Sequence, residues 1–278
     1  MITWISSYPR SGNTLLRIMF KDVFGVVTPT KYDGRKSIIA ALLGTPDHDE
    51  PWPEMRDRLR ADASMHFVKT HDAPESAEEA CIYVVRDPAA AIVSYRHYLR
   101  DINDLDLPLP VVAMGLCPYG SWSDHVKAWA PMTRPKTLLL RFEDLTANPH
   151  QCIEQIADFT GLTPTGTWNG DINRLKPTDG AFFRSGSNQR NREELTTLEQ
   201  LLISAQHGMT AKNLGYTTAE VTAAEAQSIQ ATVTHLMSDI GRLRQIVNDR
   251  EVVISGLQQA CQERLELIHR FHAALNPS

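Results

Sequence analysis

Apolar residues near the start of the chain follow two successive patterns. Residues 2–8 form an apolar run typical of a buried strand. After a short polar loop, apolar residues recur at helical spacing, namely Leu15, Leu16, Ile18, Met19, Val23 and Phe24. The pattern predicts a strand, then a loop, then an amphipathic helix over residues 13–24.

Two further apolar segments are predicted to be strands. Residues 64–71 end in Lys69, Thr70 and His71, and residues 81–85 end directly before Arg86. Pro88 suits the first turn of a following helix, for which Asp87 suits the N-cap. Strands and helices in this order favour an α/β core.

A different pattern begins after Tyr216. Apolar residues recur at alternating intervals of four and three from Ile229 to Leu275, interrupted only by Arg250 and Arg264. Heptads sustained over this length are typical of a coiled coil. The pattern therefore predicts a long C-terminal coiled-coil-type helix, and it divides the chain into domains of residues 1–216 and 217–278.

The predicted long helix begins near Thr218 or Thr222, either of which is a suitable cap. It extends ~80 Å at ~1.5 Å per residue and cannot bury its apolar stripe alone. Residues 229–275 either pair with a second copy or a partner protein, or fold back across the first domain. Heptad seams usually pair, which favours a homo-oligomer, while Arg250 and Arg264 leave the orientation open.

The polar loop after the first strand carries Arg10, Ser11, Gly12, Asn13 and Thr14. Backbone N–H groups in such a loop, together with the N-terminus of the next helix, stabilise a phosphate or sulfate group. Glycine permits a close approach of the backbone, hydroxyl groups donate hydrogen bonds, and arginine adds a permanent planar cation. An ordinary strand-to-helix turn capped by Ser11 or Asn13 is the alternative.

The loop departs from the nucleotide-binding pattern G-x-x-x-x-G-K-[ST], because it has one glycine and its cation precedes that glycine. SYPRSGNT instead resembles the YPKSGTT loop of the sulfotransferases, enzymes that use 3′-phosphoadenosine 5′-phosphosulfate (PAPS). Arg10 stands at the lysine position of that loop, and Leu15 stands where the family usually has tryptophan. The resemblance implies the sulfotransferase fold, which is an α/β fold with a P-loop-like parallel sheet flanked by helices.

Three downstream segments extend this resemblance over residues 1 to about 216. Lys69–Thr70–His71 resembles the family's KTH element. Arg86 and Ser94 have the eight-residue separation of the arginine and serine that hold the 3′-phosphate in the family. FFRSGSNQRNREEL, residues 182–195, resembles the late RKGxxGDWK segment that closes over the nucleotide.

The resemblance implies roles for individual residues. His71 is the general base, and Lys69 and Arg10 place positive charge near the sulfuryl group. Arg10 gives electrostatic help only, because a guanidinium stays charged. Phe142 is expected near the adenine, and no metal is required. The residues expected to bind PAPS are Arg10, Ser11, Gly12, Asn13, Thr14, Arg86, Ser94, Phe142, Arg184 and Gly186.

Composition narrows the expected partners and location. The 278 residues are 42% hydrophobic with a net charge of −5, whereas a nucleic-acid-binding domain is expected to be basic. The four cysteines lack C-x-x-C spacing, which indicates neither a zinc site nor a disulfide framework and fits the cytoplasm. No apolar run approaches the roughly eighteen residues of a membrane span, and no signal peptide is expected.

The sequence thus predicts a PAPS-dependent sulfotransferase with a hydroxyl-bearing small molecule, carbohydrate or lipid as acceptor. One alternative is an ATP-dependent kinase of related fold. Another is a non-catalytic coiled-coil assembly protein with a relict nucleotide fold. This alternative is favoured by Ser185 and Asn191, which stand where the family has lysine and tryptophan. Residues 31–63 and 100–118 have proline-containing, loop-like stretches and are expected to wall the acceptor pocket.

Overall fold

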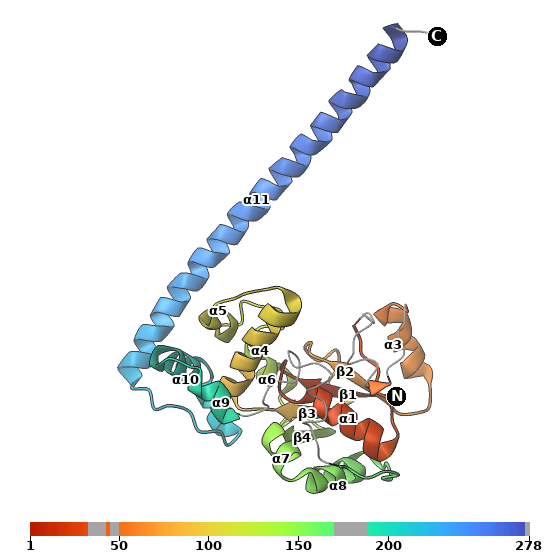
Figure 1. Ribbon diagram of the computed structural model, residues 1–278, viewed down its shortest axis with the longest axis vertical. Coiled ribbons are helices and arrows are strands. Elements are labelled where there is room, and N and C mark those ends of the chain that lie inside the picture. Colours follow the sequence, from red (N-terminus) through yellow and green to blue (C-terminus); the bar gives the residue numbers. More distant parts are fainter. Residues whose placement is uncertain (33–42, 45–49, 170–187, 276–278) are drawn as a thin grey trace. The chain divides into compact units, whose positions relative to one another are not determined.

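A computed structural model describes residues 1–32, 43–44, 50–169 and 188–275 (Figure 1). The chain divides into two units, Met1–Val221 and Thr222–Ser278. The described elements are, in chain order, β1 (Ile2–Ser7), α1 (Asn13–Phe24), α3 (Trp52–Ala61), β2 (His66–Thr70), β3 (Ala80–Val85), α4 (Pro88–Asn103), α5 (Leu109–Ala113), α6 (Trp122–Trp129), β4 (Thr137–Arg141), α7 (Phe142–Ala147), α8 (Pro149–Thr160), α9 (Asn188–Glu193), α10 (Thr197–Asn213) and α11 (Ala223–Leu275).

Among the described residues of the first unit, four parallel strands form a sheet in the order β2-β1-β3-β4. β1 lies in the interior, where Trp4 pairs with Val68 of β2 on one side and with Cys81 of β3 on the other. All residues of β1 are buried, as expected for a parallel strand that is covered on both faces. The predicted α/β fold with a parallel sheet flanked by helices is confirmed.

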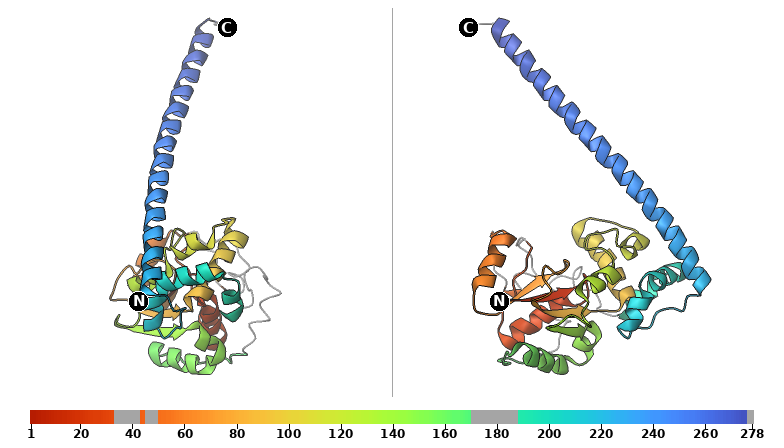
Figure 2. Two further views of the ribbon diagram at one scale, coloured as in Figure 1. Left: turned by 90° about the vertical axis from the view of Figure 1, so that its left-hand side faces the viewer. Right: turned by 180° about the vertical axis from the view of Figure 1, so that it is seen from behind.

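Helices cover both faces of this sheet. Ile5, Ile82 and Leu140 belong to one hydrophobic cluster with apolar side chains of α1, α7 and α8. On the opposite face, Tyr83 lies 6.2 Å from Trp129 of α6 between ring centroids. Figures 1 and 2 show α1, α7 and α8 on one side of the sheet and α4 and α6 on the other. Successive strand residues point to opposite faces, so each strand contributes to both layers.

The helices that follow β1 and β3 begin where the sequence predicts. α1 covers the predicted range 13–24. α4 begins at Pro88, and the carboxylate of its N-cap, Asp87, accepts a hydrogen bond from the backbone N–H of Ala90 at 2.9 Å. Both helices therefore start directly beyond the carboxyl end of a strand, which brings their N-termini to the same edge of the sheet.

The two proline-containing stretches are only partly loop-like. α3 lies within residues 31–63 and α5 within residues 100–118. Pro51 and Pro108 are the N-caps of these helices, and each helix has a further proline in its first two positions. A proline there removes no intrahelical hydrogen bond, so prolines in these stretches are compatible with helices.

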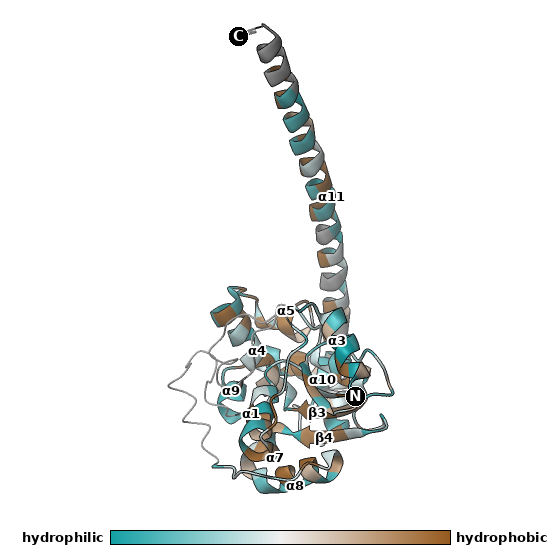
Figure 3. Ribbon diagram, turned by 90° about the vertical axis from the view of Figure 1, so that its right-hand side faces the viewer, coloured by the Kyte–Doolittle hydropathy of each residue, from teal (hydrophilic) through white to brown (hydrophobic). Residues whose placement is uncertain are grey.

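The second unit contains a single long helix, as predicted. α11 runs for 53 residues. Thr222 caps it: its hydroxyl accepts a hydrogen bond from the backbone N–H of Glu225 at 3.3 Å, and the Glu225 carboxylate accepts one from the Thr222 N–H at 2.9 Å. Figure 3 shows apolar positions along the described part of α11. Within the described ranges, no helix combines the length and apolar character needed to cross a bilayer.

Candidate active site

The loop between β1 and α1 leaves the start of α1 without an internal cap. Gly12 is the N-cap residue, no side chain among the described residues caps the helix, and its first turn carries no acidic residue. The Ser11 hydroxyl and the Asn13 Oδ1 atom are buried without a hydrogen-bond partner in the described part of the chain. Buried polar atoms of this kind are rare in folded proteins. A helix N-terminus with an unused buried hydroxyl beside it suits a bound anion.

Phe142 closes one side of this loop. A Cβ atom on Gly12, which has a φ of 109°, would lie only 2.7 Å from Cδ2 of Phe142. The same ring lies 4.2 Å from the guanidinium carbon of Arg86. The first residue of α7 thus contacts both the loop and the cation at the end of β3, and position 12 has no space for a side chain.

Arg86 is buried at the carboxyl end of β3, with only 4% of its surface exposed. Its Nε donates a hydrogen bond to Oδ1 of Asn188 at 2.8 Å, and its Nη1 donates one to the backbone carbonyl of Arg10 at 3.0 Å. Burial lowers the pKa of Arg86 to about 10. The guanidinium therefore remains charged at neutral pH, and it is fixed against the loop backbone.

Arg10 reaches from the loop to α4. Its Nε donates a hydrogen bond to the Ser94 hydroxyl at 3.3 Å. Its guanidinium carbon also lies 5.4 Å from the centre of the Tyr98 ring. Arg10 and Ser94 are thus in direct contact. The sequence predicts Arg10 near the sulfuryl group of PAPS and Ser94 at its 3′-phosphate.

His71 lies just beyond β2, and its ring orientation is fixed by β1. Its Nδ1 lies 2.7 Å from the Ser7 carbonyl oxygen. A carbonyl can only accept, so Nδ1 carries the proton and the lone pair is on Nε2. Burial, and next the charge of Lys69, lower the pKa of His71 well below its usual range. The imidazole is therefore neutral at pH 7.

Lys69 and Tyr32 lie beside His71. The Tyr32 hydroxyl accepts a hydrogen bond from the His71 backbone N–H at 2.7 Å, and the Lys69 ammonium lies 4.4 Å from the centre of the Tyr32 ring. Burial, and next the charge of Arg17, lower the pKa of Lys69 to about 7. The charge of this lysine is therefore sensitive to pH near neutrality, unlike that of an arginine.

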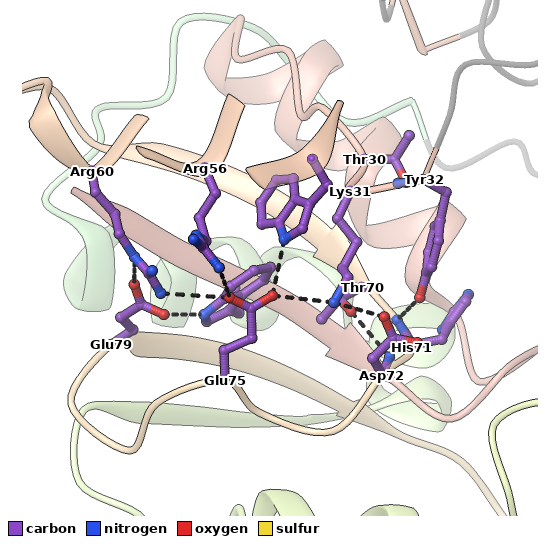
Figure 4. Close-up of polar contacts among 12 residues, drawn as sticks. Thr30, Lys31, Tyr32, Arg56, Arg60, Thr70, His71, Asp72, Glu75 and Glu79 are labelled. Carbon is purple, nitrogen blue, oxygen red and sulfur yellow. Dashed lines mark hydrogen bonds and ion pairs between the residues drawn. The ribbon is translucent and has the colours of Figure 1, made fainter. Parts of the chain in front are cut away.

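An ionic network joins Lys31 to the acidic residues that follow His71 in the chain, as Figure 4 shows. Lys31 lies 2.7 Å from an oxygen of Asp72 and 3.2 Å from an oxygen of Glu75. The backbone of residues 29–31 runs alongside β2, where the Lys69 N–H donates to the Pro29 carbonyl at 2.8 Å. These contacts place Tyr32 next to the imidazole.

The structure brings the predicted residues to one edge of the sheet in two groups. Arg10, Gly12, Arg86, Ser94 and Phe142 are linked by the contacts above, and Ser11, Asn13 and Thr14 belong to the same loop and helix start. Lys69 and His71 form the second group, which the Ser7 carbonyl joins to β1. Arg184 and Gly186 lie outside the described residues.

Asn188 and Tyr32 are among the residues at this site that were not predicted. Asn188, which binds Arg86, lies in the segment 182–195 that resembles the family's late loop, so its neighbourhood was recognised while its contact was not. Tyr32 had no motif around it. Among the described residues, no group of three His, Cys, Asp or Glu side chains is placed to hold a metal ion.

Residues 2–241 match the family of the sulfotransferase domain. Flavonol 3-sulfotransferase from Flaveria bidentis is 28% identical over 197 residues, which cover 62% of this chain and 61% of that protein. Sulfotransferase 1B1 from Mus musculus is 34% identical over 176 residues, which cover 57% of this chain and 58% of that protein. The chain thus spans about three fifths of the length of these curated relatives.

Solved structures share the fold. Mouse sulfotransferase SULT7A1 complexed with PAP matches with a TM-score of 0.54 at 17% identity, over 84% of this chain and 88% of that one. Retinol dehydratase in complex with androsterone and inactive cofactor PAP matches with a TM-score of 0.55 at 20% identity, over 80% of this chain and 83% of that one. With the family match over most of its length and this shared fold, the chain belongs to the sulfotransferase family.

Proposed function

We propose that the protein transfers the sulfuryl group of PAPS to an acceptor hydroxyl, with His71 as the general base. The observation that carries the proposal is the hydrogen bond from His71 Nδ1 to the Ser7 carbonyl at 2.7 Å. This bond holds the imidazole against the end of β1, where the loop that carries Ser11 and Gly12 begins. It also leaves the Nε2 lone pair to accept a proton. A neutral imidazole at pH 7 is in the protonation state that this role requires.

PAPS supplies the sulfuryl group, and the residues present suit it. Its 5′-phosphosulfate would be held at the start of α1 by Ser11, Gly12, Asn13 and Thr14. Arg86 and Ser94 would hold the 3′-phosphate, and Phe142 would contact the adenine. The buried Ser11 hydroxyl, which has no hydrogen-bond partner among the described residues, and the close approach of Phe142 to Gly12 support this fit. Two structural neighbours are PAP complexes, which agrees with it.

His71 removes the proton of the acceptor hydroxyl as the acceptor oxygen attacks sulfur in line; the bond from sulfur to the 5′-phosphate oxygen breaks, and adenosine 3′,5′-bisphosphate leaves. Lys69, Arg10 and the N–H groups of the loop stabilise negative charge that develops on the leaving oxygen. Positioning and charge stabilisation therefore carry most of the catalysis, as in phosphoryl transfer. This division of roles makes base removal and nucleotide binding separable by mutation.

The acceptor binds on the side of His71 that aromatic rings border. The centroids of Tyr32 and Tyr119 lie 6.4 Å and 5.5 Å from that of the imidazole. Aromatic faces accommodate the apolar faces of sugar, phenol and lipid rings, so a small-molecule, carbohydrate or lipid hydroxyl suits this surface. Incubation with PAPS and a panel of such acceptors, followed by mass spectrometry for the added sulfuryl group, identifies the class.

Two substitutions separate the assigned roles. His71→Ala should abolish turnover while it leaves the affinity for adenosine 3′,5′-bisphosphate nearly unchanged in calorimetry. Arg86→Ala should weaken that affinity roughly tenfold or more, because it removes a charge-assisted hydrogen-bond donor. His66→Ala is the matched control, since His66 lies on the same strand and contacts exposed Asp62 instead.

Three results would contradict the proposal. Equal loss of bisphosphate binding in the His71 and Arg86 variants would refute the separate roles. Magnesium-dependent binding of ATP in preference to the bisphosphate would indicate a kinase. A protein that neither binds the bisphosphate nor forms product with any acceptor would be the assembly protein that the sequence left open.

A further inference from the structure

We propose that α11 pairs with α11 of a second copy as a parallel, in-register two-stranded coiled coil. This inference does not depend on the proposed function. The seam consists of the positions named a and d of each heptad. The a residues are Val233, Ile240, Val247, Ile254, Cys261, Ile268 and Leu275, and the d residues are Ile229, Leu236, Leu243, Arg250, Leu257, Arg264 and Phe271.

From Val247 to Ile268 the apolar side chains of this seam are exposed, whereas Val233 near the start of α11 is buried. Val247 is 53% exposed, Ile254 52% and Leu257 61%. A helix buries such a stripe against another element, and the seven heptads of α11 exceed the three or four that indicate a coiled coil. The side chains of Ile254, Leu257, Gln258 and Cys261 border a shallow groove on the helix. Their spacing of i, i+3, i+4 and i+7 is that of the hole that receives a knob from a facing helix.

The residue types at a and d favour two parallel strands. Five of the seven a positions hold Val or Ile, whereas Leu is the commonest residue at d. β-branched residues at a with leucine at d favour parallel dimers. Ile246 and Val253, which flank the seam at g positions, border the holes that receive the a residues of the other helix. They are thus covered by the same pairing.

Charge complementarity around Arg250 gives the same orientation. In a parallel in-register pair, Arg250 enters the hole formed by Val247, Arg250, Glu251 and Ile254 of the second copy. Each guanidinium then lies beside a Glu251 carboxylate of the other helix. Both residues are exposed in α11, so each is accessible to the other copy.

In an aligned antiparallel pair, in which Ile229 of one helix lies opposite Leu275 of the other, Arg250 has no such acidic neighbour. Arg250 would enter a hole of Arg250, Val253, Ile254 and Leu257, which has no acidic residue, and the two Glu251 side chains would face each other. That arrangement does place Asp239 beside Arg264. In the parallel pair the two Arg264 residues share a layer and direct their charged ends to water, which weakens the seam at that layer only.

The free cysteine of the seam reports the orientation directly. Cys261 is exposed, whereas Cys81 and Cys152 are buried. A disulfide requires Cα atoms within roughly 7 Å of each other. Only the parallel in-register pair places Cys261 opposite Cys261, because the aligned antiparallel pair places it opposite Leu243. Mild oxidation of the full chain with copper phenanthroline should therefore give a reducible covalent dimer.

Two matched variants control the oxidation experiment. Cys261→Ser should abolish the covalent dimer. In the Cys261→Ser background, Val247→Cys returns a thiol to the seam and should restore the covalent dimer. Gln259→Cys in the same background places the thiol on the outer face and should not restore it. The parallel orientation would be overturned if light scattering shows a dimer and neither Cys261 nor the cysteine of Val247→Cys cross-links it. A monomeric or trimeric full chain at micromolar concentration would overturn the pairing.

Glu251→Gln gives opposite signs for the two orientations. In the parallel dimer it removes two interhelical ion pairs, which should raise the dimer dissociation constant roughly three- to tenfold. In the aligned antiparallel dimer it removes a repulsion, so the constant would fall. Glu263→Gln, which lies outside the seam, should change the constant less than about twofold. A tighter dimer from Glu251→Gln would contradict the proposal.

Discussion

At the scale of single residues, the two cations predicted near the sulfuryl group differ in their response to pH. Arg10 stays charged at any physiological pH. The pKa of Lys69 is lowered to about 7 by burial and by the charge of Arg17. Lys69 therefore carries its charge below pH 7 and loses it as the pH rises through 7, in the range where the enzyme would work.

The Lys69 charge gives a testable pH dependence. For the wild-type protein, kcat/KM should fall as the pH rises above about 7, because this constant reports the ionisation of the free enzyme. Lys69→Arg should keep the positive charge and remove that fall. A pH–rate profile from pH 5.5 to 9.5 measures both, with Lys31→Arg as control because Lys31 is ion-paired to Asp72 nearby. An alkaline fall that persists in Lys69→Arg would assign it to another group.

Residue positions at strand ends were predictable, whereas contacts across the site were not. Arg86 and His71 follow apolar runs, and the carboxyl ends of parallel strands share one edge, so their location follows from the sequence. The bonds from Arg10 to Ser94 and from Arg86 to Asn188 join residues 84 and 102 positions apart. Such pairs depend on how α4 and α9 pack, which no local pattern encodes.

At the scale of elements, α7 and α9 together orient Arg86. The Asn188 amide accepts from Arg86 and donates to Oε1 of Glu143 at 2.6 Å. The same carboxylate accepts from the Asp87 backbone N–H at 3.1 Å and from the Tyr216 hydroxyl at 2.8 Å. One carboxylate at the start of α7 thus connects the start of α4, the start of α9 and the end of the first unit.

This arrangement predicts an effect of Asn188 on nucleotide binding. Asn188→Ala removes the acceptor of the Arg86 Nε, so the guanidinium loses one of the hydrogen bonds that orient it and keeps the one from Nη1 to the Arg10 carbonyl. Calorimetry should show roughly tenfold weaker binding of adenosine 3′,5′-bisphosphate, the value expected for a hydrogen bond to a charged group. Gln189→Ala is the matched control, since Gln189 contacts Glu193 within the same helix. Unchanged affinity in Asn188→Ala would mean that Arg86 is held without α9.

Element boundaries followed from the sequence where the determinants are local. The range of α1 and the Asp87 cap of α4 depend on neighbours within four residues, and both were predicted. The helices α3 and α5 were missed because their prolines suggested loops. Proline ends a helix only from an interior position, and the sequence alone did not show where these helices begin.

At the scale of the whole molecule, the family match extends to residue 241, beyond the end of the first unit at Val221. All described residues assigned to nucleotide binding or catalysis lie within Met1–Val221. The seam proposed for self-association lies within α11. The two activities are therefore expected to be separable.

A chain that ends at Val221 tests this separation. It should be monomeric by light scattering and should bind adenosine 3′,5′-bisphosphate within about twofold of the full chain, as expected for independent sites. Full-length Val247→Asp is the matched control, because a charge in the seam should break pairing while α11 remains. Loss of nucleotide binding in the shortened chain, with retention in Val247→Asp, would show that the start of α11 supports the first unit.

The interior position of β1 also has a consequence for folding during synthesis. Its partners come much later in the chain, because Ile2 pairs with His66 and Thr3 pairs with Ala80. Both pairings therefore require closure of long loops, which slows folding. At roughly 5–20 residues per second, the ribosome needs about 4–15 s to complete both partners. Until β2 has been synthesised, this fully buried strand has two unpaired edges, and until β3 follows it keeps one, so its backbone groups are open to pairing with other chains during that time.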